Sequence, residues 1–279
     1  MKINAYYNGK FGNVSEITIP LTDRAIFFGD GIYDAAIGRN GKIFMLDDHV
    51  ERFFSNAAAL NIPLSETRSE LKRLLLKTVM LSQEPSYFVY FQLSRFSEER
   101  IHAAPATERS NLLVTVSPFK LCDRNKELNL ITTEDVRHYM CNIKTLNLLS
   151  AVLSSMEAAR SGADESVFVR GDTVTECSHS NIHFIKDGKI ITHPLDRYIL
   201  PGISRKHMLS VCDALAIPYE ERKFTVDELL EADEVLVTSS SKLAIPVKRI
   251  NGKEYEITER SIGWRICKRM RDDFLLETL

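Results

Sequence analysis

A polar stretch without periodicity, residues 120–127, divides the 279-residue sequence into two parts that each contain strand-like and helix-like patterns. Such a stretch between periodic segments is typical of a linker. A chain of this length exceeds a usual single domain, so two moderate domains or one large domain are expected. We predict an N-terminal domain over residues 1–119, a linker over 120–127 and a C-terminal domain over 128–279.

Both parts mix short strands with amphipathic helices, which predicts an α/β fold. The predicted strands are two pieces within residues 3–20, then 27–37, 42–46, 87–94, 112–116, 128–132, 165–170, 173–176, 181–185, 189–192 and 235–238. The predicted helices begin near Asp47 or Asp48, near Glu66, after Lys144, near Gly202 and near Thr258, and residues 95–109 read as a polar loop.

Composition excludes several classes of protein. With 44% hydrophobic residues the chain can bury a sizeable core, and its net charge of −2 without a basic stripe argues against nucleic acid as a partner. No apolar run is long enough to span a bilayer, and residues 1–7 have no signal-peptide core. The five cysteines are odd in number and scattered, which favours free thiols in a reducing cytoplasm.

The stretch 141–150 begins as an extended segment and then becomes helical, with Lys144 just before the helix. The predicted apolar face of this helix comprises Leu146, Leu149, Leu153 and Met156. A lysine here is unusual, because cations are favoured at the C-terminal ends of helices. Lys144 is either a solvated surface lysine or an amine kept near neutral to form a Schiff base.

Two stretches have the composition of an anion site. Residues 201–204 place glycine and serine at a predicted helix start, and residues 238–241 place hydroxyls after a strand. Serine and glycine at helix starts are also common as simple caps. Arg52 can add charge-assisted hydrogen bonds to an anion or can be a solvated arginine. Glu176 lies in a hydroxyl-rich turn, as part of a polar hairpin or as a partner for a pyridinium nitrogen.

Cys177, His179 and His183 have side chains of the metal-binding types. They scatter around a predicted strand and turn, and no second pair follows at zinc spacing. We therefore expect no metal.

Five ordered motifs resemble the class IV pyridoxal-phosphate enzymes, a family that includes D-amino acid transaminases, branched-chain transaminases and aminodeoxychorismate lyases. The resemblance covers nearly the whole chain. The motifs are Phe28-Gly29-Asp30-Gly31-Ile32-Tyr33, His49-x-x-Arg52, Ile143-Lys144-Thr145-Leu146-Asn147, Thr175-Glu176-x-Ser178-x-Ser180-Asn181 and Gly202-Ile203-Ser204-Arg205. It implies two α/β domains of fold type IV, with pyridoxal 5'-phosphate between them, in a homodimer.

The resemblance also implies roles for single residues. Lys144 looks like the Schiff-base lysine, and Glu176 looks like the partner of the pyridine nitrogen. The implied phosphate-binding residues are Arg52, Ile203, Ser204 and Ser240, and Leu200 is the implied apolar floor under the ring. The implied reaction is a ping-pong transamination between an amino acid and a 2-oxo acid.

Smaller features favour the D-amino acid transaminases. Arg100-x-His102 is similar to the pair that, with a tyrosine matching Tyr33, binds the substrate carboxylate from the neighbouring subunit in that subfamily. Branched-chain enzymes carry an arginine in the strand after the motif glycine, where this chain has Ile37. Arg39 comes two residues later, which disfavours that alternative.

Two residues depart from the D-specific pattern. Asp34 stands where glutamate is usual, and Phe96 stands where glycine often follows the strand's arginine. Both departures bear on substrate range more than on reaction type. The alternatives are an aminodeoxychorismate lyase, a branched-chain transaminase, an (R)-selective amine transaminase, and a non-enzymatic carrier that kept the fold.

Overall fold

The computed structural model describes residues 3–104, 109–123 and 125–279. Parts of three sequence predictions lie outside these described residues, namely residues 1–2 of the N-terminal segment, 105–108 of the polar loop and Arg124 of the linker.

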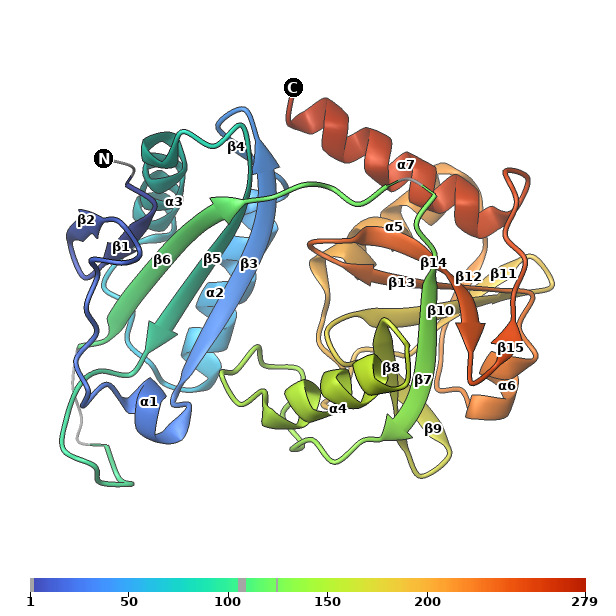
Figure 1. Cartoon of the computed structure of the whole chain (residues 1–279), viewed down its shortest axis with the longest axis horizontal. Coiled ribbons are helices and arrows are strands. Elements are labelled where there is room, and N and C mark those ends of the chain that lie inside the picture. Colours follow the sequence, from blue (N-terminus) through green and yellow to red (C-terminus); the bar gives the residue numbers. More distant parts are fainter. Residues whose placement is uncertain (1–2, 105–108, 124) are drawn as a thin grey trace. The chain divides into compact units, whose positions relative to one another are not determined.

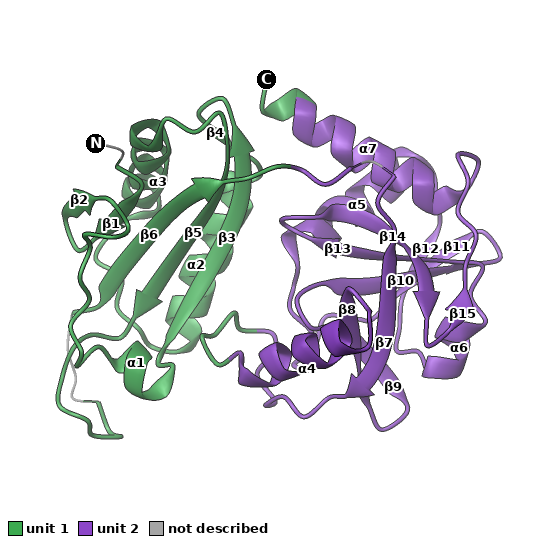
Figure 2. Ribbon diagram, in the orientation of Figure 1, with its two compact units in different colours: residues 1–120, 143–147, 276–279 green, residues 121–142, 148–275 purple. Residues whose placement is uncertain are grey.

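The chain divides into two compact units (Figure 2). The first comprises Met1–Lys120, Ile143–Asn147 and Leu276–Leu279, and the second comprises Leu121–Asn142 and Leu148–Leu275. The segment that carries Lys144 therefore groups with the first unit by its contacts. The sequence prediction had placed it within a continuous C-terminal domain.

The first unit is an antiparallel six-stranded sheet in the order β2-β1-β6-β5-β3-β4, with α2 and α3 on one face (Figure 1). Its strands are β1 (Ala5–Tyr7), β2 (Lys10–Gly12), β3 (Gly31–Arg39), β4 (Lys42–Ile43), β5 (Ser86–Ser94) and β6 (Asn111–Pro118). Its helices are α1 (Arg24–Phe28), α2 (Leu46–Ala59) and α3 (Arg68–Ser82). Phe53 of α2 packs on Phe91 of β5, with ring centroids 4.8 Å apart, so helix and sheet share one core.

The structure corrects the start of the strand predicted over residues 27–37. Phe27 and Phe28 belong to the short helix α1, which Asp23 caps by accepting a hydrogen bond from the Ala25 backbone. Gly29 then ends the helix with a φ of 60°, a left-handed conformation that glycine adopts at little cost. The strand consequently starts only at Gly31.

The next two elements also differ from their prediction. The strand predicted over 42–46 is only two residues long, because α2 already begins at Leu46. Neither Asp47 nor Asp48 is the cap. Both lie in the first helical turn, where the helix dipole stabilises a negative side chain. The helix predicted from Glu66 matches α3, whose capping box joins Thr67 to Glu70.

The second unit is a nine-stranded sheet with four helices (Figure 1). Its strands are β7 (Leu128–Glu134), β8 (Glu165–Arg170), β9 (Thr173–Cys177), β10 (Asn181–Lys186), β11 (Lys189–Thr192), β12 (Tyr219–Glu221), β13 (Glu234–Ser239), β14 (Leu243–Ile250) and β15 (Lys253–Glu254). Its helices are α4 (Leu149–Arg160), α5 (Ile203–Ala214), α6 (Val226–Leu230) and α7 (Ile262–Glu277). The strand order is β12-β11-β10-β13-β14-β7-β8-β9, and β15 pairs with β14.

The predicted apolar face of α4 is not its buried face. Leu149, Leu153 and Met156 are 70%, 57% and 45% exposed. The helix instead buries Ser154 and Ala158 next to the sheet, where small side chains allow close approach. The Ser154 hydroxyl hydrogen bonds to the Thr133 hydroxyl at 2.8 Å, so a polar contact holds this helix and leaves its apolar stripe outside.

No helix in the described ranges is both long enough and apolar enough to cross a membrane.

Candidate active site

The Lys144 segment lies beside the start of β3, where Thr145 forms an isolated antiparallel bridge with Ile32. The Tyr33 backbone N–H donates to the Lys144 carbonyl at 2.9 Å, and the Leu146 N–H donates to the Gly31 carbonyl at 3.1 Å. A side chain at Gly31 would come within 2.8 Å of the Leu146 side chain and 2.5 Å of the Leu93 carbonyl. Glycine is therefore needed for this segment to lie against the strand.

The Lys144 amine lies against Tyr33. Its Nζ donates to the Tyr33 hydroxyl at 3.3 Å and is 4.3 Å from the ring centroid. Tyr33 also stacks on Tyr90 of the neighbouring strand, with centroids 5.5 Å apart. The structure thus brings together two residues that the sequence analysis selected separately, the candidate Schiff-base lysine and the candidate carboxylate-binding tyrosine.

Arg52 is buried, with 8% exposure, and its guanidinium is paired with the fully buried Asp34. Arg52 Nε donates to Asp34 Oδ2 at 2.8 Å, and Nη2 donates to Oδ1 at 2.8 Å. His49 Nδ1 lies 2.8 Å from the same Oδ1. Burial raises the pKa of Asp34, but the Arg52 and His49 charges outweigh it and hold this pKa well below its ordinary value.

This arrangement explains two sequence features. Asp34, the departure from the expected glutamate, contacts Arg52 and His49 of α2, and so fixes the arginine of the His-x-x-Arg motif. Phe96, the second departure, is buried, and its carbonyl accepts from the Arg24 backbone N–H at 3.0 Å.

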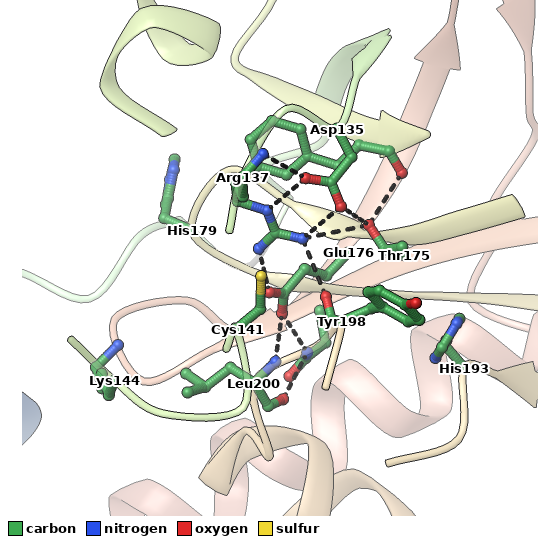
Figure 3. Close-up of polar contacts among 12 residues, drawn as sticks. Asp135, Arg137, Cys141, Lys144, Thr175, Glu176, His179, His193, Tyr198 and Leu200 are labelled. Atoms are coloured by element: carbon green, nitrogen blue, oxygen red, sulfur yellow. Dashed lines mark hydrogen bonds and ion pairs between the residues drawn. The ribbon is translucent and has the colours of Figure 1, made fainter. Parts of the chain in front are cut away.

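Glu176 lies in the second unit, where its carboxylate is held from three directions (Figure 3). Its Oε1 accepts from Arg137 Nη1, and its Oε2 accepts from Asn181 Nδ2 at 2.9 Å and from the Leu200 backbone N–H at 3.0 Å. The same Asn181 amide donates to the Leu200 carbonyl at 3.0 Å. The candidate ring-nitrogen partner and the candidate floor residue are therefore joined in one hydrogen-bonded group.

Arg137 connects this group to a second buried carboxylate, Asp135 (Figure 3). Arg137 donates to Asp135 through Nε at 2.9 Å and through Nη2 at 3.0 Å. Burial raises the pKa of Asp135, but hydrogen bonds from Arg137 outweigh it and lower this pKa. Burial likewise lowers the pKa of Arg137, and the Glu176 and Asp135 charges more than reverse that effect. The arginine thus remains a cation between two carboxylates.

Each candidate anion stretch has one feature that would suit an anion. α5 begins after Gly202, where a Cβ would lie 2.1 Å from Asn181 Oδ1, so only glycine fits at this helix N-terminus. Ile203 and Ser204 form the first turn and are buried. Ser239 is the last residue of β13, and its buried Oγ has no hydrogen-bond partner within the described ranges; Ser240 follows it. An unsatisfied buried hydroxyl at this turn fits an absent ligand oxygen.

Arg100 and His102 lie on an exposed loop of the first unit. The Arg100 guanidinium is 5.3 Å from the Phe28 ring centroid, and the His102 ring is 5.2 Å from the same ring. The two candidate carboxylate-binding residues therefore share one aromatic neighbour.

Comparison with known proteins identifies the family. A family model described as amino-transferase class IV matches residues 31–250. The D-alanine aminotransferase of Staphylococcus aureus strain N315 is 38% identical over 274 residues, covering 96% of this chain and 95% of that protein. The chain belongs to the class IV aminotransferases. The resemblance predicted from its motifs is confirmed, and so is the enzyme class, since class IV aminotransferases depend on pyridoxal phosphate.

Solved structures confirm the predicted fold of this class IV aminotransferase. A branched-chain aminotransferase from Thermoproteus uzoniensis, crystallised with norvaline, has a TM-score of 0.91 at 21% identity, covering 99% of this chain and 95% of that chain. A putative 4-amino-4-deoxychorismate lyase from Legionella pneumophila has a TM-score of 0.85 at 21% identity, with 95% and 97% covered. At such identities the likeness establishes the fold alone.

Sequence reasoning missed several buried charges in this aminotransferase. The Arg137–Glu176 and Asp34–His49 contacts carried no local signal, because each joins positions that no motif spacing connects. The single available hint was Asp135-x-Arg137, a charged pair directly after a predicted strand. Lys242, which pairs with the wholly buried Glu165, was likewise missed.

Proposed function

We propose that this chain is a D-amino acid transaminase, which moves the amino group of a D-amino acid such as D-alanine to a 2-oxo acid. The observation that carries the proposal is the 3.3 Å contact between the Lys144 amine and the Tyr33 hydroxyl. It puts the reactive amine next to a residue that can bind the substrate carboxylate, so a proton at Cα lies within reach of Lys144. The 38% identical D-alanine aminotransferase supports the D-specific form.

Pyridoxal 5'-phosphate, when bound, supplies an electron-withdrawing ring that accepts the electrons left when Cα loses its proton. We expect Lys144 to hold this group covalently and Glu176 to accept a hydrogen bond from its ring nitrogen. Leu200 would pack under the ring. Phosphate binding is assigned to Arg52, Ile203, Ser204 and Ser240. The unsatisfied Ser239 hydroxyl and the glycine-limited start of α5 support an anion at the last three.

Each residue then has a definite chemical task. The Lys144 amine, once displaced by the substrate amine, would take the proton from Cα and deliver it to the cofactor carbon that carries the substrate nitrogen. Arg137, by pairing with Glu176, fixes the position of the carboxylate that would accept the hydrogen bond from the ring nitrogen. Lys144 would approach the substrate from one face of the cofactor ring only. The side of the pocket that binds the substrate carboxylate would therefore decide whether the D or the L enantiomer presents its Cα hydrogen to the amine. Tyr33, Arg100 and His102 would bind the carboxylate on the D side.

We propose that the enzyme works as a homodimer, in which Arg100 and His102 serve the neighbouring subunit. The exposed apolar stripe of α4, including Leu149 and Leu153, supports an interface there, because monomers rarely expose such a surface. Arg100 and His102 are themselves exposed, so a second chain can meet them. We also propose a cytoplasmic location, since all five cysteines are free.

The test is a coupled assay of purified enzyme with D-alanine, L-leucine and aminodeoxychorismate. We expect D-alanine to react fastest. Arg100→Ala should lower kcat/KM for D-alanine by about ten- to a hundredfold, because a lost charge-assisted hydrogen bond costs about 1.5–3 kcal/mol. Faster turnover of L-leucine, or release of pyruvate from aminodeoxychorismate, would move the branched-chain or lyase alternative ahead.

A mixing experiment tests the dimer. Lys144→Ala and Arg100→Ala chains are each expected to be poorly active alone. In a mixed dimer, one site would receive both defects and the other would receive neither, so activity should return to about half of the wild-type value. If Arg100 acts within its own chain, mixing restores nothing.

A further inference from the structure

The side chain of Arg24 contacts the loop that carries Arg100 and His102. Arg24 opens the short helix α1 and is 4% exposed. Its Nη1 donates to the Ile101 carbonyl at 2.6 Å, and its Nη2 donates to the His102 carbonyl at 3.1 Å. Two successive peptide groups of the loop are therefore fixed by one planar guanidinium, whose donors have a rigid geometry.

Arg24 is itself fixed from two sides. Its Nε donates to Asp30 Oδ2 at 2.8 Å, and its guanidinium carbon lies 4.7 Å from the Phe28 ring centroid. Phe28 is also the aromatic neighbour of Arg100 and His102. The buried Arg24 and the Phe28 ring thus restrict the positions that the Arg100 and His102 side chains can adopt.

The same carboxylate has a second arginine that serves as a natural comparison. Arg95 donates through Nε to Asp30 at 3.0 Å, as Arg24 does. Its Nη1 and Nη2 donate to two successive carbonyls, Asn61 at 2.9 Å and Leu60 at 3.0 Å, which lie at the end of α2. The two arginines have the same binding pattern, but only the one at position 24 contacts the 101–102 carbonyls.

Burial raises the pKa of Asp30, but hydrogen bonds from Arg95 and Arg24 outweigh it, so this pKa is lowered. The carboxylate therefore stays ionised near neutral pH. It keeps both arginines in place over the range in which the enzyme is assayed.

We infer that Arg24 is a positioning residue for substrate recognition: by binding the carbonyls of Ile101 and His102, it sets the place of Arg100 and His102. This inference rests on the proposed function, because it gives those two side chains the substrate carboxylate as their ligand. Misplacing a binding group by about 1 Å can cost on the order of a hundredfold in rate. Loss of Arg24 should therefore weaken carboxylate binding without touching Lys144 or the phosphate-binding residues.

The experiment compares Arg24→Gln, Arg24→Lys and the matched control Arg95→Gln in the full-length holoenzyme. Arg24→Gln should raise KM for D-alanine about ten- to a hundredfold, with normal cofactor absorbance and a much smaller change in kcat. Arg24→Lys keeps the charge and one donor direction, so it should recover part of the loss. Arg95→Gln should leave KM for D-alanine within about threefold of wild type.

A second substrate separates positioning from general damage. 2-Aminopropane replaces the carboxylate of alanine with a methyl group, so its single-turnover rate should be the same in wild type and Arg24→Gln. Equal losses for D-alanine and 2-aminopropane, or equal losses in Arg24→Gln and Arg95→Gln, would overturn the inference.

A third measurement needs no substrate. Hydrogen exchange at residues 98–104 should speed up in Arg24→Gln and not in Arg95→Gln; unchanged exchange overturns the positioning role. If wild type does not use D-alanine, or if Arg100→Ala has no effect, the proposed function fails. If Arg100→Ala impairs D-alanine turnover while Arg24→Gln does not, only the present inference fails.

Discussion

Arg52 of the first unit and Arg137 of the second are both paired with buried carboxylates, yet the two arginines have opposite roles in their pairs. Arg52 is the motif residue, and Asp34 holds it with two hydrogen bonds of 2.8 Å. Glu176 is the motif residue in the other unit, and there the arginine is the holder. In one unit a carboxylate holds a candidate phosphate-binding cation, and in the other a cation holds the carboxylate proposed to face the ring nitrogen.

The comparison separates two tasks, because the charge proposed to meet a ligand is not the charge that orients it. Asp34 is fully buried, so its task is to hold Arg52. Arg137 pairs with two buried carboxylates, Asp135 and Glu176, so its loss would weaken the charge compensation of both, although Asp135 would keep Arg170. Substitution of Arg137 in the second unit should therefore lower the stability of the fold more than substitution of Asp34 in the first.

The largest expected effect is that of Arg137→Met. Removing one partner of a buried ion pair typically costs about 3–5 kcal/mol, and two carboxylates depend on this arginine. We expect the free energy of unfolding to fall by at least that amount, as measured by urea unfolding at pH 7. Arg170→Met is the control, because Arg170 pairs with Asp135 at 3.2 Å and, in its salt bridges, not with Glu176. A smaller loss in Arg137→Met than in Arg170→Met would contradict the comparison.

Asp34→Asn should have an intermediate effect. Asparagine keeps one acceptor but loses the charge, so Arg52 and His49 lose charge-assisted hydrogen bonds worth about 1.5–3 kcal/mol. Unfolding free energy at pH 7 should fall by about that amount. Cofactor retention on dialysis should also fall, since Arg52 is no longer held. Retention equal to that of wild type would show that Arg52 does not need Asp34.

The Asp34→Asn variant also tests how the stability of the fold depends on pH. The folded-state pKa of Asp34 lies below its ordinary value, so its ionisation stabilises the fold above the unfolded pKa of about 3.9. That contribution is lost as the pH falls toward the folded pKa. The stability difference between wild type and Asp34→Asn should therefore narrow below about pH 4. A constant difference from pH 6 to pH 3 would contradict this assignment.

The smallest expected effect comes from an exposed ion pair that joins α2, the helix of Arg52, to α3. Glu51 precedes Arg52 and accepts two hydrogen bonds from Arg68, at 2.6 and 3.0 Å, but both side chains are more than half exposed. Exposed ion pairs contribute little, because solvent screens them. The melting temperature of Glu51→Gln should stay within about 2 °C of wild type. A drop like that of Asp34→Asn would show that burial is not what separates these pairs.

Local patterns were sufficient to predict much of the fold. The strands around Asn8-Gly9 and those between residues 165 and 192 have turn signals directly beside them, and the structure contains them. The short helix α1 was not predicted, because its apolar Phe27-Phe28 pair reads equally well as strand. Its cap, Asp23, is identified as a cap only by a hydrogen bond.

Other features depend on surroundings that a sequence pattern does not contain. The sequence periodicity identifies the apolar stripe of α4 but does not show whether that stripe faces the sheet or solvent. In the structure the stripe is exposed, and the helix packs on the sheet through Ser154 and Ala158. The residues that fix the candidate site residues in place are far from them along the chain. Arg137 is 39 residues from Glu176, and Arg24 is 77 residues from Ile101. Contacts of that kind follow from the tertiary fold, and no spacing rule predicts them.

The position of the Lys144 segment beside β3 also has a consequence for the order of folding. Lys144 and Tyr33 are 111 residues apart in the chain, and the intervening sequence includes the whole of β7 and its flanking loops. Contacts of such long range close late, because the entropy of a large loop is lost before they form. A nascent chain that ends near Lys120 would contain all six strands of the first unit but lack the segment that carries Lys144. Because its contacts are of such long range, we expect Lys144 to be among the last residues that folding fixes in place.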